Sequence, residues 1–376
     1  MKEIVHKKFC CGCTACQIQC PKQAIQMMKD KKGFQYPKII LNKCIDCGLC
    51  QKICPAIHTV PKKQPQKIIG LKMRDKSKIL RSQSGGAFTA IAEYFLKNGA
   101  IIYGCALDHE HQAKYIRVTT LQELERLKGS KYVQASLDNT YNNVKQDLEN
   151  GYTVLFSGTA CYIAGVIKAV EKVKNKSKLY TVDIICHGTP SPHIYRDYLQ
   201  HIEQKYKSKI SYFDFRSRNL PWKLHKEYIK LQNGKEIYHD FYRSFFYSDL
   251  ILRSSCGICK YASKERCSDF TIGDYWGVEK EFPEFDDSRG VSLLFFNTKR
   301  SETLLKELEE EIDYINLELE QCLQPNLEHP TCYSKIMSNV FWILYQKFGM
   351  SISYQKFFKV SEFVARIKKH FHHLFV

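Results

Sequence analysis

The sequence lacks several features that would place it in a common class. It has no apolar run of the about 18 residues that a membrane helix needs, and its N-terminus, MKEIVHKKFCCGC, lacks the apolar core of a secretory signal. We therefore expect a cytoplasmic protein without a transmembrane segment. No G-x-G-x-x-G fingerprint or P-loop occurs, so neither a standard NAD site nor an NTPase is indicated. No known nucleic-acid-binding motif is present, so we expect no nucleic-acid partner.

What the chain does have is many cysteines and an uneven charge. Its 376 residues include 17 cysteines, which in a reduced cytosol favour metal ligands or redox groups over disulfides. The net charge is +18, and residues 1–83 hold 18 Lys and Arg against four Asp and Glu. The length predicts two or three domains.

Eight of the first nine cysteines form one motif that occurs twice. Cys10, Cys13, Cys16 and Cys20 precede Pro21, and Cys44, Cys47, Cys50 and Cys54 precede Pro55 with the same spacing, 34 residues later. The run C-x2-C-x2-C-x3-C-P is typical of two-cluster bacterial ferredoxins. The repeat therefore predicts two 4Fe–4S clusters and an internal duplication.

In this motif the fourth cysteine of each run binds the other cluster. The first cluster is expected on Cys10, Cys13, Cys16 and Cys54, and the second on Cys44, Cys47, Cys50 and Cys20. Structural zinc is the alternative, but it usually uses two separated C-x2-C pairs or Cys/His mixtures. Cys11 lies outside the pattern and is interpreted as a bystander thiol.

The chain after residue 60 changes character. A Pro/Lys/Gln segment at 61–67 is typical of a linker, and strands then alternate with helices, which indicates an α/β domain with a largely parallel or mixed sheet. We expect an α+β bacterial-ferredoxin domain over residues 1–60, a linker and first strand over 61–83, the α/β domain over 84–300 and a helical extension over 301–376. A short hairpin strand is expected near residues 33–40, and a second hairpin over 226–239.

Three glycine-containing turns of the α/β domain follow a strand or open a helix. They are Ser84-Gly85-Gly86, Ser157-Gly158-Thr159 and His187-Gly188-Thr189. Free N–H groups at a helix start, together with hydroxyls, favour phosphate binding, although a glycine turn is more often only a turn. Ligands of open α/β sheets bind at the carboxyl ends of strands, where these turns are predicted.

Five ordered segments extend these turns. They are Ser84-Gly85-Gly86-Ala87-Phe88-Thr89, Gly129-Ser130-Lys131-Tyr132-Val133-Gln134, Ser157-Gly158-Thr159-Ala160-Cys161, Cys186-His187-Gly188-Thr189-Pro190-Ser191 and Gly273-Asp274-Tyr275-Trp276-Gly277. With the ferredoxin runs, they resemble the coenzyme F420 hydrogenase/dehydrogenase beta subunit family over about residues 5–300. One departure is Ala160-Cys161-Tyr162, where the family pattern has Pro-Cys-Gln.

The resemblance implies an iron–sulfur flavoprotein oxidoreductase. Electrons would pass between a ferredoxin-type donor, the clusters, FAD and a small-molecule substrate, either a deazaflavin or a metabolite of a surface-polysaccharide pathway. The alternative is an electron-transfer subunit that relays electrons to a partner enzyme. The residues expected to bind FAD are Ser84, Gly85, Gly86, Thr89, Lys131, Ser157, Gly158, Thr159, Gly188, Tyr275 and Trp276.

Several of these residues also have a plainer interpretation. His187 is the candidate catalytic proton donor, but a histidine beside a glycine turn is as often structural. Lys131 is expected at a flavin phosphate or the flavin's anionic edge, or else at the surface. Tyr275 and Trp276 either stack on an aromatic ring or belong to the core.

Four later cysteines suggest a third cluster. Cys256 and Cys259 form a C-x2-C pair, and Cys161 and Cys186 lie at predicted strand ends that could meet them. Together these four thiols suit another iron–sulfur site near the flavin. Alternatively, Cys161 and Cys186 are small buried hydrophobic residues.

Partners are suggested by charge. The basic N-terminal region predicts an acidic ferredoxin or flavodoxin as electron partner. Segment 301–312 is interpreted as an acidic, exposed helix, and the tail from Val360 as a basic amphipathic helix. That tail either packs on protein, which we favour, or makes peripheral contact with an anionic membrane.

Overall fold

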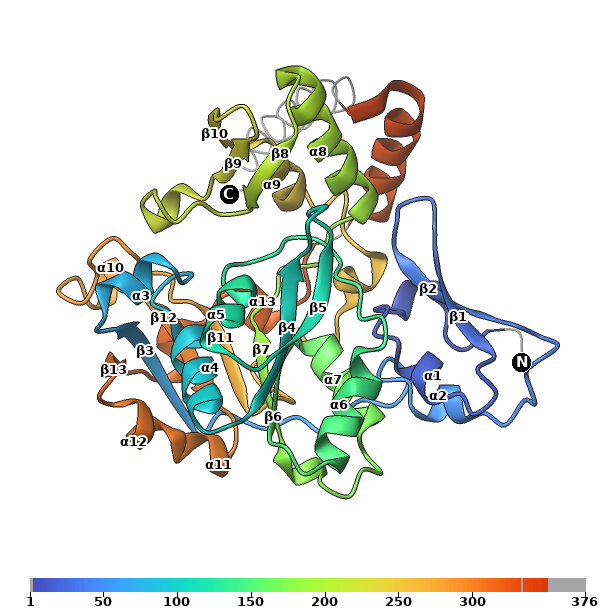
Figure 1. The fold of residues 1–376 in the computed structure, drawn as a ribbon, viewed down its shortest axis with the longest axis horizontal. Coiled ribbons are helices and arrows are strands. Elements are labelled where there is room, and N and C mark those ends of the chain that lie inside the picture. Colours follow the sequence, from blue (N-terminus) through green and yellow to red (C-terminus); the bar gives the residue numbers. More distant parts are fainter. Residues whose placement is uncertain (1–2, 333, 351–376) are drawn as a thin grey trace, which may run out of the picture.

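The computed structural model describes residues 3–332 and 334–350. Figure 1 shows three parts: a small N-terminal unit, a large sheet with helices on both faces, and a smaller sheet with its own helices near one end of the large one. In these ranges no helix is long and apolar enough to cross a membrane. The tail predicted to be an amphipathic helix from Val360 lies outside the described residues.

The N-terminal unit has ferredoxin-like architecture. The strands β1 (Ile25–Lys29) and β2 (Gln35–Ile39) pair antiparallel, which confirms the predicted hairpin. Two helices of one turn, α1 (Ala15–Ile18) and α2 (Leu49–Lys52), follow the cysteine loops. Their N-caps, Thr14 and Gly48, stand 34 residues apart and both have left-handed backbone, so the duplication is visible in the conformation as well as the sequence.

The α/β part contains an eight-stranded mixed sheet in the order β13-β3-β12-β11-β7-β6-β4-β5. The strands are β3 (Lys67–Met73), β4 (Ile101–Leu107), β5 (Ala113–Val118), β6 (Val154–Thr159), β7 (Leu179–Ile184), β11 (Phe270–Asp274), β12 (Ser292–Phe296) and β13 (Ile312–Asn316). The neighbours β4, β6, β7 and β11 run parallel, and the outer pairs run antiparallel. The expected mixed sheet is confirmed.

Helices cover both faces of this sheet. Helices α4 (Ala87–Lys97) and α12 (Leu304–Leu308) pack on one face, and α6 (Thr140–Glu149) and α7 (Ala160–Ala169) on the other. Alternate residues of β6 divide between these two cores, with Leu155 in one and Val154 and Phe156 in the other, as period-2 geometry requires.

The shorter helices are α3 (Lys76–Leu80), α5 (Leu121–Leu124), α10 (Val278–Glu281), α11 (Lys299–Glu302) and α13 (Pro325–Glu328), with 3-10 turns η1 (Lys7–Phe9), η2 (Glu125–Leu127), η3 (Lys176–Lys178), η4 (Trp222–Leu224), η5 (Ser254–Ile258) and η6 (Leu319–Cys322).

The smaller sheet has the order β10-β9-β8, with β8 (Ile210–Asp214), β9 (Glu227–Leu231) and β10 (Glu236–His239). The turn at Asn233-Gly234 joins β9 to β10, so the second hairpin is also confirmed. Helices α8 (Pro192–Tyr206) and α9 (Phe241–Tyr247) pack against this sheet, and residues 335–350 are helical and contribute Phe341 and Trp342 to the same aromatic core.

The structure corrects two expectations about element boundaries. Residues after 300 are not simply a helical extension, because β13 pairs with β3 in the main sheet and the predicted acidic helix is instead α12, with Leu304, Leu305 and Leu308 buried. Ser157-Gly158-Thr159 is not a turn, because β6 continues through Thr159 and α7 begins at the next residue. Contacts distant in sequence decided both outcomes: burial of the α12 leucines in one case and pairing of residues 157–159 with β7 in the other.

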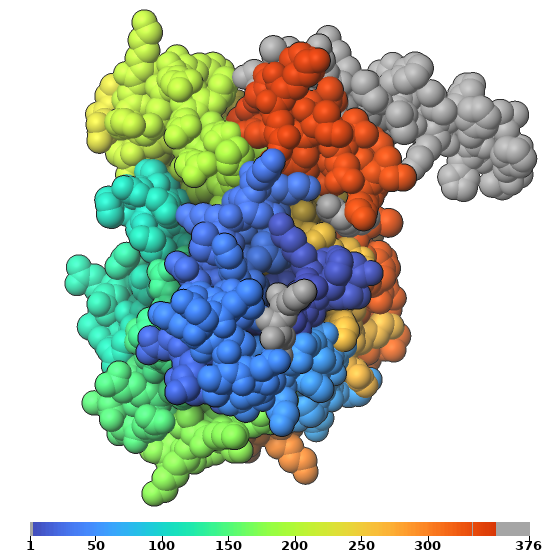
Figure 2. All heavy atoms as spheres, turned by 90° about the vertical axis from the view of Figure 1, so that its right-hand side faces the viewer, coloured from blue at the N-terminus to red at the C-terminus, as the bar shows by residue number. Residues whose placement is uncertain are grey.

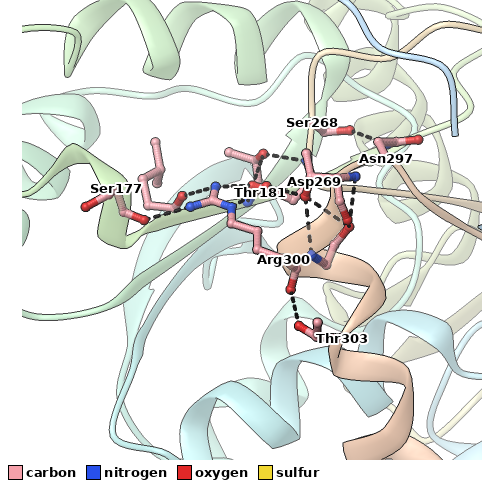
Figure 3. A network of polar contacts seen from close by, with 10 residues as sticks. Ser177, Thr181, Ser268, Asp269, Asn297, Arg300 and Thr303 are labelled. Atoms are coloured by element: carbon pink, nitrogen blue, oxygen red, sulfur yellow. Dashed lines mark hydrogen bonds and ion pairs between the residues drawn. The ribbon is translucent and has the colours of Figure 1, made fainter. Parts of the chain in front are cut away.

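A buried polar network fixes the edge of the sheet opposite the strand carboxyl ends. Asp269, just before β11, accepts hydrogen bonds from both Thr181 of β7 and the guanidinium of Arg300, as Figure 3 shows. Arg300 also donates to the carbonyl of Ser177 at 2.7 Å. These bonds join different elements, so the network fixes α11 against the first residues of β7. The cavity described next lies at the opposite edge of the sheet.

Candidate functional site

The first set of ferredoxin cysteines encloses a small internal cavity. Its lining includes Cys10, Cys13, Cys16 and Cys54, the four residues predicted to share the first cluster, together with Cys11. All four are buried. The cavity lies against α7, where Gly165 leaves room for it: a Cβ at Gly165 would stand 2.9 Å from the Cβ of Cys13.

The second set of ferredoxin cysteines encloses a separate cavity nearer the solvent. Cys20, Cys44, Cys47 and Cys50 line it, so the crossing of Cys20 and Cys54 between the two halves is present in the geometry. Cys47 is exposed, and Leu41 and Ile45 beside this set are 67% and 58% exposed. Figure 2 shows the N-terminal unit, in blue, facing the solvent on one side of the molecule.

These donor sets suit clusters better than a single ion. Within residues 3–332 and 334–350, no three His, Cys, Asp or Glu side chains converge as the ligands of one metal ion do. The thiolates of a 4Fe–4S centre bind four different iron atoms and therefore surround a cavity, which is how both sets are arranged. The residues present thus fit the group that the motif implies.

A third group of thiols lies between the first cysteine set and the main sheet. Cys161, Cys186, Cys256 and Cys259 come within electrostatic range of one another: burial, then Cys256, Cys161 and Cys259, raises the pKa of Cys186 well above its ordinary value. Burial also raises the pKa of Cys256 to about 12. The four cysteines predicted to hold a third cluster therefore lie in one region of the structure, contributed by β6–α7, the end of β7 and η5.

Cys11, interpreted from the sequence as a bystander, connects this group to the ferredoxin unit. The thiol of Cys11 interacts with the thiols of both Cys161 and Cys13. The Cys11 pKa is raised well above its ordinary value, first by its interaction with Cys13. A chain of three thiols thus runs from the carboxyl end of β6 to the first cysteine set.

A cavity of about 1100 Å³ opens at the carboxyl ends of the parallel strands β4, β6, β7 and β11. This is the edge at which open α/β sheets bind ligands, and the volume lies at the upper limit of usual small-molecule sites. Helix α9 and the loop before β9 contribute to its wall from the smaller sheet. The predicted position of the ligand site therefore coincides with this large cavity.

Most of the predicted flavin-binding residues line this cavity. They are Ser84, Gly86, Thr89, Lys131, Ser157, Gly158, Thr159, Gly188 and Trp276, together with the predicted catalytic residue His187. The first turn of α4 lies in the wall, and its N-cap Gly86, with φ of 90°, supplies no side-chain acceptor. The positive end of the α4 dipole is thus available to an anion.

Two predicted flavin-binding residues do not line the cavity. A Cβ on Gly85 would stand 2.0 Å from the carbonyl oxygen of Leu71, so Gly85 is required by close packing against β3 rather than by a phosphate. Tyr275 is fully buried in the core beside Val278 and Leu293. Only its neighbour Trp276 faces the cavity.

Lys131 lines the cavity but its amine is already engaged. The Nζ atom donates to the carbonyls of Arg126, Leu127 and Lys128 at 3.1, 2.9 and 2.8 Å, where the η2 turn ends. Burial lowers the pKa of Lys131 to about 8. The amine of Lys131 therefore caps the end of η2. These bonds occupy its N–H groups, so the structure does not support the expectation that Lys131 donates to a flavin phosphate.

His187 forms a pair with a carboxylate in the cavity wall. Its Nε2 lies 2.7 Å from Oδ1 of Asp249, and its ring packs edge-on against Phe246 with centroids 4.9 Å apart. Asp249 itself lines the cavity and has a left-handed backbone, φ 64°, at the end of α9. The arrangement orients one imidazole and can move a proton at the other ring nitrogen.

Sequence reasoning missed the basic wall that the smaller sheet contributes. Arg216, Trp222, His225 and Arg243 all line the cavity. Arg216 Nε, Trp222 Nε1 and His225 Nε2 are buried without a hydrogen-bond partner among the described residues, as is Gln83 Oε1. Burial, then Arg216 and Arg243, lowers the pKa of His225 to about 3, so this ring is neutral. The sequence signal for this wall was that Arg216, Trp222 and His225 fall within one loop between strands.

Three segments of the chain match known family models. Residues 151–320 match the C-terminal family of the coenzyme F420 hydrogenase/dehydrogenase beta subunit, and residues 69–140 match the corresponding N-terminal family. The chain belongs to the coenzyme F420 hydrogenase/dehydrogenase beta subunit family. Residues 9–57 match the 4Fe-4S dicluster domain, so this family member carries an iron–sulfur unit in front of its α/β part.

Two curated proteins resemble parts of this family member. Pyruvate synthase subunit PorD of Thermotoga maritima is 43% identical over 56 residues, 15% of this chain and 52% of that protein. Coenzyme F420-dependent sulfite reductase of Methanocaldococcus jannaschii is 27% identical over 182 residues, 45% of this chain and 26% of that protein. The matched parts thus span about half and a quarter of these relatives. Among solved structures, a chain of the F420-reducing NiFe hydrogenase complex of Methanosarcina barkeri aligns with a TM-score of 0.48 and 17% identity, over 69% of this chain and 87% of that one.

Proposed function

We propose that this chain is an iron–sulfur flavoprotein oxidoreductase that holds two 4Fe–4S clusters in its N-terminal unit and FAD in the large cavity. The observation that carries the proposal is the continuity between the two: the thiols of Cys161, Cys11 and Cys13 lead from the carboxyl end of β6 to the first cysteine set. Thr159, which lines the cavity, brings its Oγ1 within 3.3 Å of the Sγ of Cys161 and so joins the cavity to these thiols. A cavity joined in this way to a dicluster unit suits exchange of electrons between them.

FAD fits the cavity by charge and by hydrogen-bonding capacity. The N-terminus of α4 and the guanidinium of Arg243 suit its phosphates, and Trp276 supplies an aromatic face. The unpartnered Nε1 of Trp222 and Nε2 of His225 need an acceptor or donor that a bound heterocycle would supply. When bound, the clusters supply single-electron transfer and the flavin supplies hydride transfer.

His187 is the proposed proton-transfer residue. Asp249 holds its Nε2, which leaves the other ring nitrogen to give a proton to substrate or cofactor. Arg216 is paired with Asp274 in the same cavity, and its buried Nε has no hydrogen-bond partner among the described residues. A proton from His187 and a hydrogen bond from Arg216 favour a substrate that needs both on reduction, which includes deazaflavin-like molecules and anionic pathway metabolites.

The electron donor is proposed to dock on the N-terminal unit. Eight lysines of residues 3–60 are exposed: Lys7, Lys8, Lys22, Lys29, Lys31, Lys38, Lys43 and Lys52. They surround a unit whose second cysteine set has the exposed Cys47 and the apolar Leu41 and Ile45 at its rim. A small acidic ferredoxin or flavodoxin matches this combination of charge and apolar surface.

The test is anaerobic purification followed by iron, sulfide and flavin analysis. At least about eight iron atoms per chain are expected from two clusters, with stoichiometric FAD. Zinc in place of iron after anaerobic reconstitution, or no flavin in the denatured supernatant after incubation with FAD, would refute the proposal.

A third cluster on Cys161, Cys186, Cys256 and Cys259 is part of the same proposal. In the full-length protein, Cys256→Ser should lower the iron content by about four atoms per chain, and Cys332→Ser, at an exposed cysteine, should not. Equal iron contents in wild type and Cys256→Ser would show that these thiols are structural.

The alternative is a relay subunit without an organic substrate of its own. The polar groups of the cavity wall favour an enzyme over a relay subunit. Arg216, Trp222 and His225 each have a side-chain nitrogen without a partner among the described residues, and they lie outside α4, where a phosphate would bind. Turnover of a small substrate by the purified protein with reduced ferredoxin would support the enzyme. Reduction of flavin without turnover of any substrate, restored by a partner enzyme, would support the relay.

A further inference from the structure

One arginine is buried at the junction of the N-terminal unit and the α/β domain. Arg253 is 1% exposed and is the largest fully buried side chain of the described residues. It lies immediately before η5, the turn that carries Cys256, and points into the N-terminal unit.

The hydrogen-bond acceptors of Arg253 are uncharged. Its Nε donates to the carbonyl of Cys10 at 2.6 Å, its Nη2 to the carbonyl of Gln35 at 2.8 Å and its Nη1 to Oε1 of Gln134 at 3.3 Å. The guanidinium also lies over the ring of Tyr36, 4.0 Å from its centroid. Among the ion pairs of the described residues, none joins Arg253 to a carboxylate.

Other buried arginines of this chain are paired differently. Arg216 meets Asp274 at 2.6 Å, and Arg266, which is 2% exposed, meets Asp183 at 3.0 Å. A buried cation without a counter-charge is costly, because it loses hydration that neutral acceptors replace only in part. Arg253 therefore requires negative charge from a source other than Asp or Glu.

Within the described part of the chain, the acidic groups in reach of Arg253 are the hydroxyls of Tyr36 and Tyr162 and the thiols of Cys10 and Cys11, and Cys10 becomes a thiolate when it binds iron. We propose that Arg253 is the counter-ion of the cluster held by Cys10, Cys13, Cys16 and Cys54, and that it raises the reduction potential of that cluster. This inference rests on the proposed iron–sulfur function. Arg253 is a positioning residue, because it acts on the ligand loop and not on a substrate.

The contacts of Arg253 agree with this placement. Its guanidinium donates to the backbone carbonyl of Cys10, a member of the first cysteine set, and its own position in the chain is just before Cys256 of the third thiol group. Arg253 thus links the first cysteine set to the third thiol group.

The expected effect follows from charge. A 4Fe–4S core with four thiolates carries −2 when oxidised and −3 when reduced, so a fixed buried cation stabilises the reduced form more strongly. Removing the cation should make reduction harder. An exposed lysine of the same unit should matter much less, because solvent screens it.

The experiment is a redox titration of the anaerobic, full-length protein followed by electron paramagnetic resonance. In Arg253→Met, one resolved couple should become harder to reduce by about tenfold in its equilibrium constant, or 59 mV for one electron. Arg253→Lys should keep most of the wild-type potential because it keeps the charge. Lys38→Gln, at an exposed lysine, is the matched control and should shift every couple by less than Arg253→Met does.

A second variant keeps the test decisive if Arg253→Met does not assemble its clusters. Gln134→Glu places a carboxylate where Oε1 now accepts from Arg253, which neutralises the cation without removing it, and should lower the same potential. Unchanged or higher potentials in cluster-containing Arg253→Met or Gln134→Glu protein would overturn the inference and leave the proposed function intact. A wild-type protein without clusters would instead refute the proposed function itself.

Discussion

The two halves of the N-terminal unit have the same cysteine spacing but opposite surroundings. The four cysteines Cys10, Cys13, Cys16 and Cys54 are buried and their cavity lies against α7 and beside Arg253, whereas Cys20, Cys44 and Cys50 are half-buried, Cys47 is exposed, and the exposed Leu41 and Ile45 lie beside them. Identical ligand chemistry is thus given an inner and an outer position. The difference suits the outer half to contact with a partner and the inner half to contact with the cavity.

The largest effect is expected when either of the two cysteines that cross between the halves is replaced. Cys20→Ser should remove the outer cluster, and Cys54→Ser the inner one, with a loss of about four iron atoms in each variant. Because Cys13 of the inner set packs directly against Gly165 of α7, Cys54→Ser should also slow electron transfer from the clusters to the flavin more than Cys20→Ser does. Iron analysis and flavin absorbance measure both. The same residual cluster in the two variants would contradict the crossing.

A pair of glycine substitutions measures the packing difference directly. Gly12 of the inner half and Gly48 of the outer half have φ values of 77° and 72°, so alanine strains both backbones alike. A Cβ on Gly12 would stand 2.6 Å from the Gln134 side chain and 3.1 Å from the carbonyl of Gln35, whereas one on Gly48 meets nothing within 4 Å. Gly12→Ala should therefore destabilise the cluster-containing protein by about 1–3 kcal/mol more than Gly48→Ala.

Denaturant unfolding of the two holo variants under argon checks this difference. Equal midpoints would mean that the inner half is not held tightly against Gln134 and the α/β domain. A lower midpoint for Gly48→Ala would reverse the comparison, because it would place the tighter packing on the outer half.

The smallest expected effect concerns docking at the outer half. Reduction of the clusters by an acidic ferredoxin should slow by roughly tenfold between about 20 and 300 mM salt, since screening shortens the reach of the exposed lysines. Lys43→Gln, near the outer cysteine set, should weaken this salt dependence. Lys299→Gln, far along the chain at α11, is the control. A rate that does not change with salt would count against docking on this face.

Sequence reasoning succeeded where the chemistry is local. The cysteine spacing predicted which four thiols gather in each half, and the structure places each predicted set around one cavity, with Cys20 and Cys54 exchanged between the halves. The α/β alternation predicted the mixed sheet and placed the ligand site at its carboxyl edge, where the cavity lies. His187, Gly86 and Trp276 all reach that cavity.

Predictions from short stretches of sequence failed where the residue that packs against a segment is distant in the chain. Gly85 looked like part of a phosphate turn, but its neighbour in space is Leu71 of β3. Residues 312–316 looked helical in context, but they complete the sheet as β13 because β3 needed a partner at its open edge. Arg216 and His225 belong to a loop whose place in the cavity depends on how the smaller sheet packs.

The sequence by itself determined the chemistry of this protein: two four-cysteine ligand sets, a basic N-terminal region and an α/β domain with a ligand edge. Only the tertiary structure decided the environment of each part, since burial and electrostatic field depend on contacts far apart along the chain. It placed Arg253 and α7 beside one cysteine set and solvent beside its twin. The repeat is the same in both halves, so the distinction between them comes from what each half packs against.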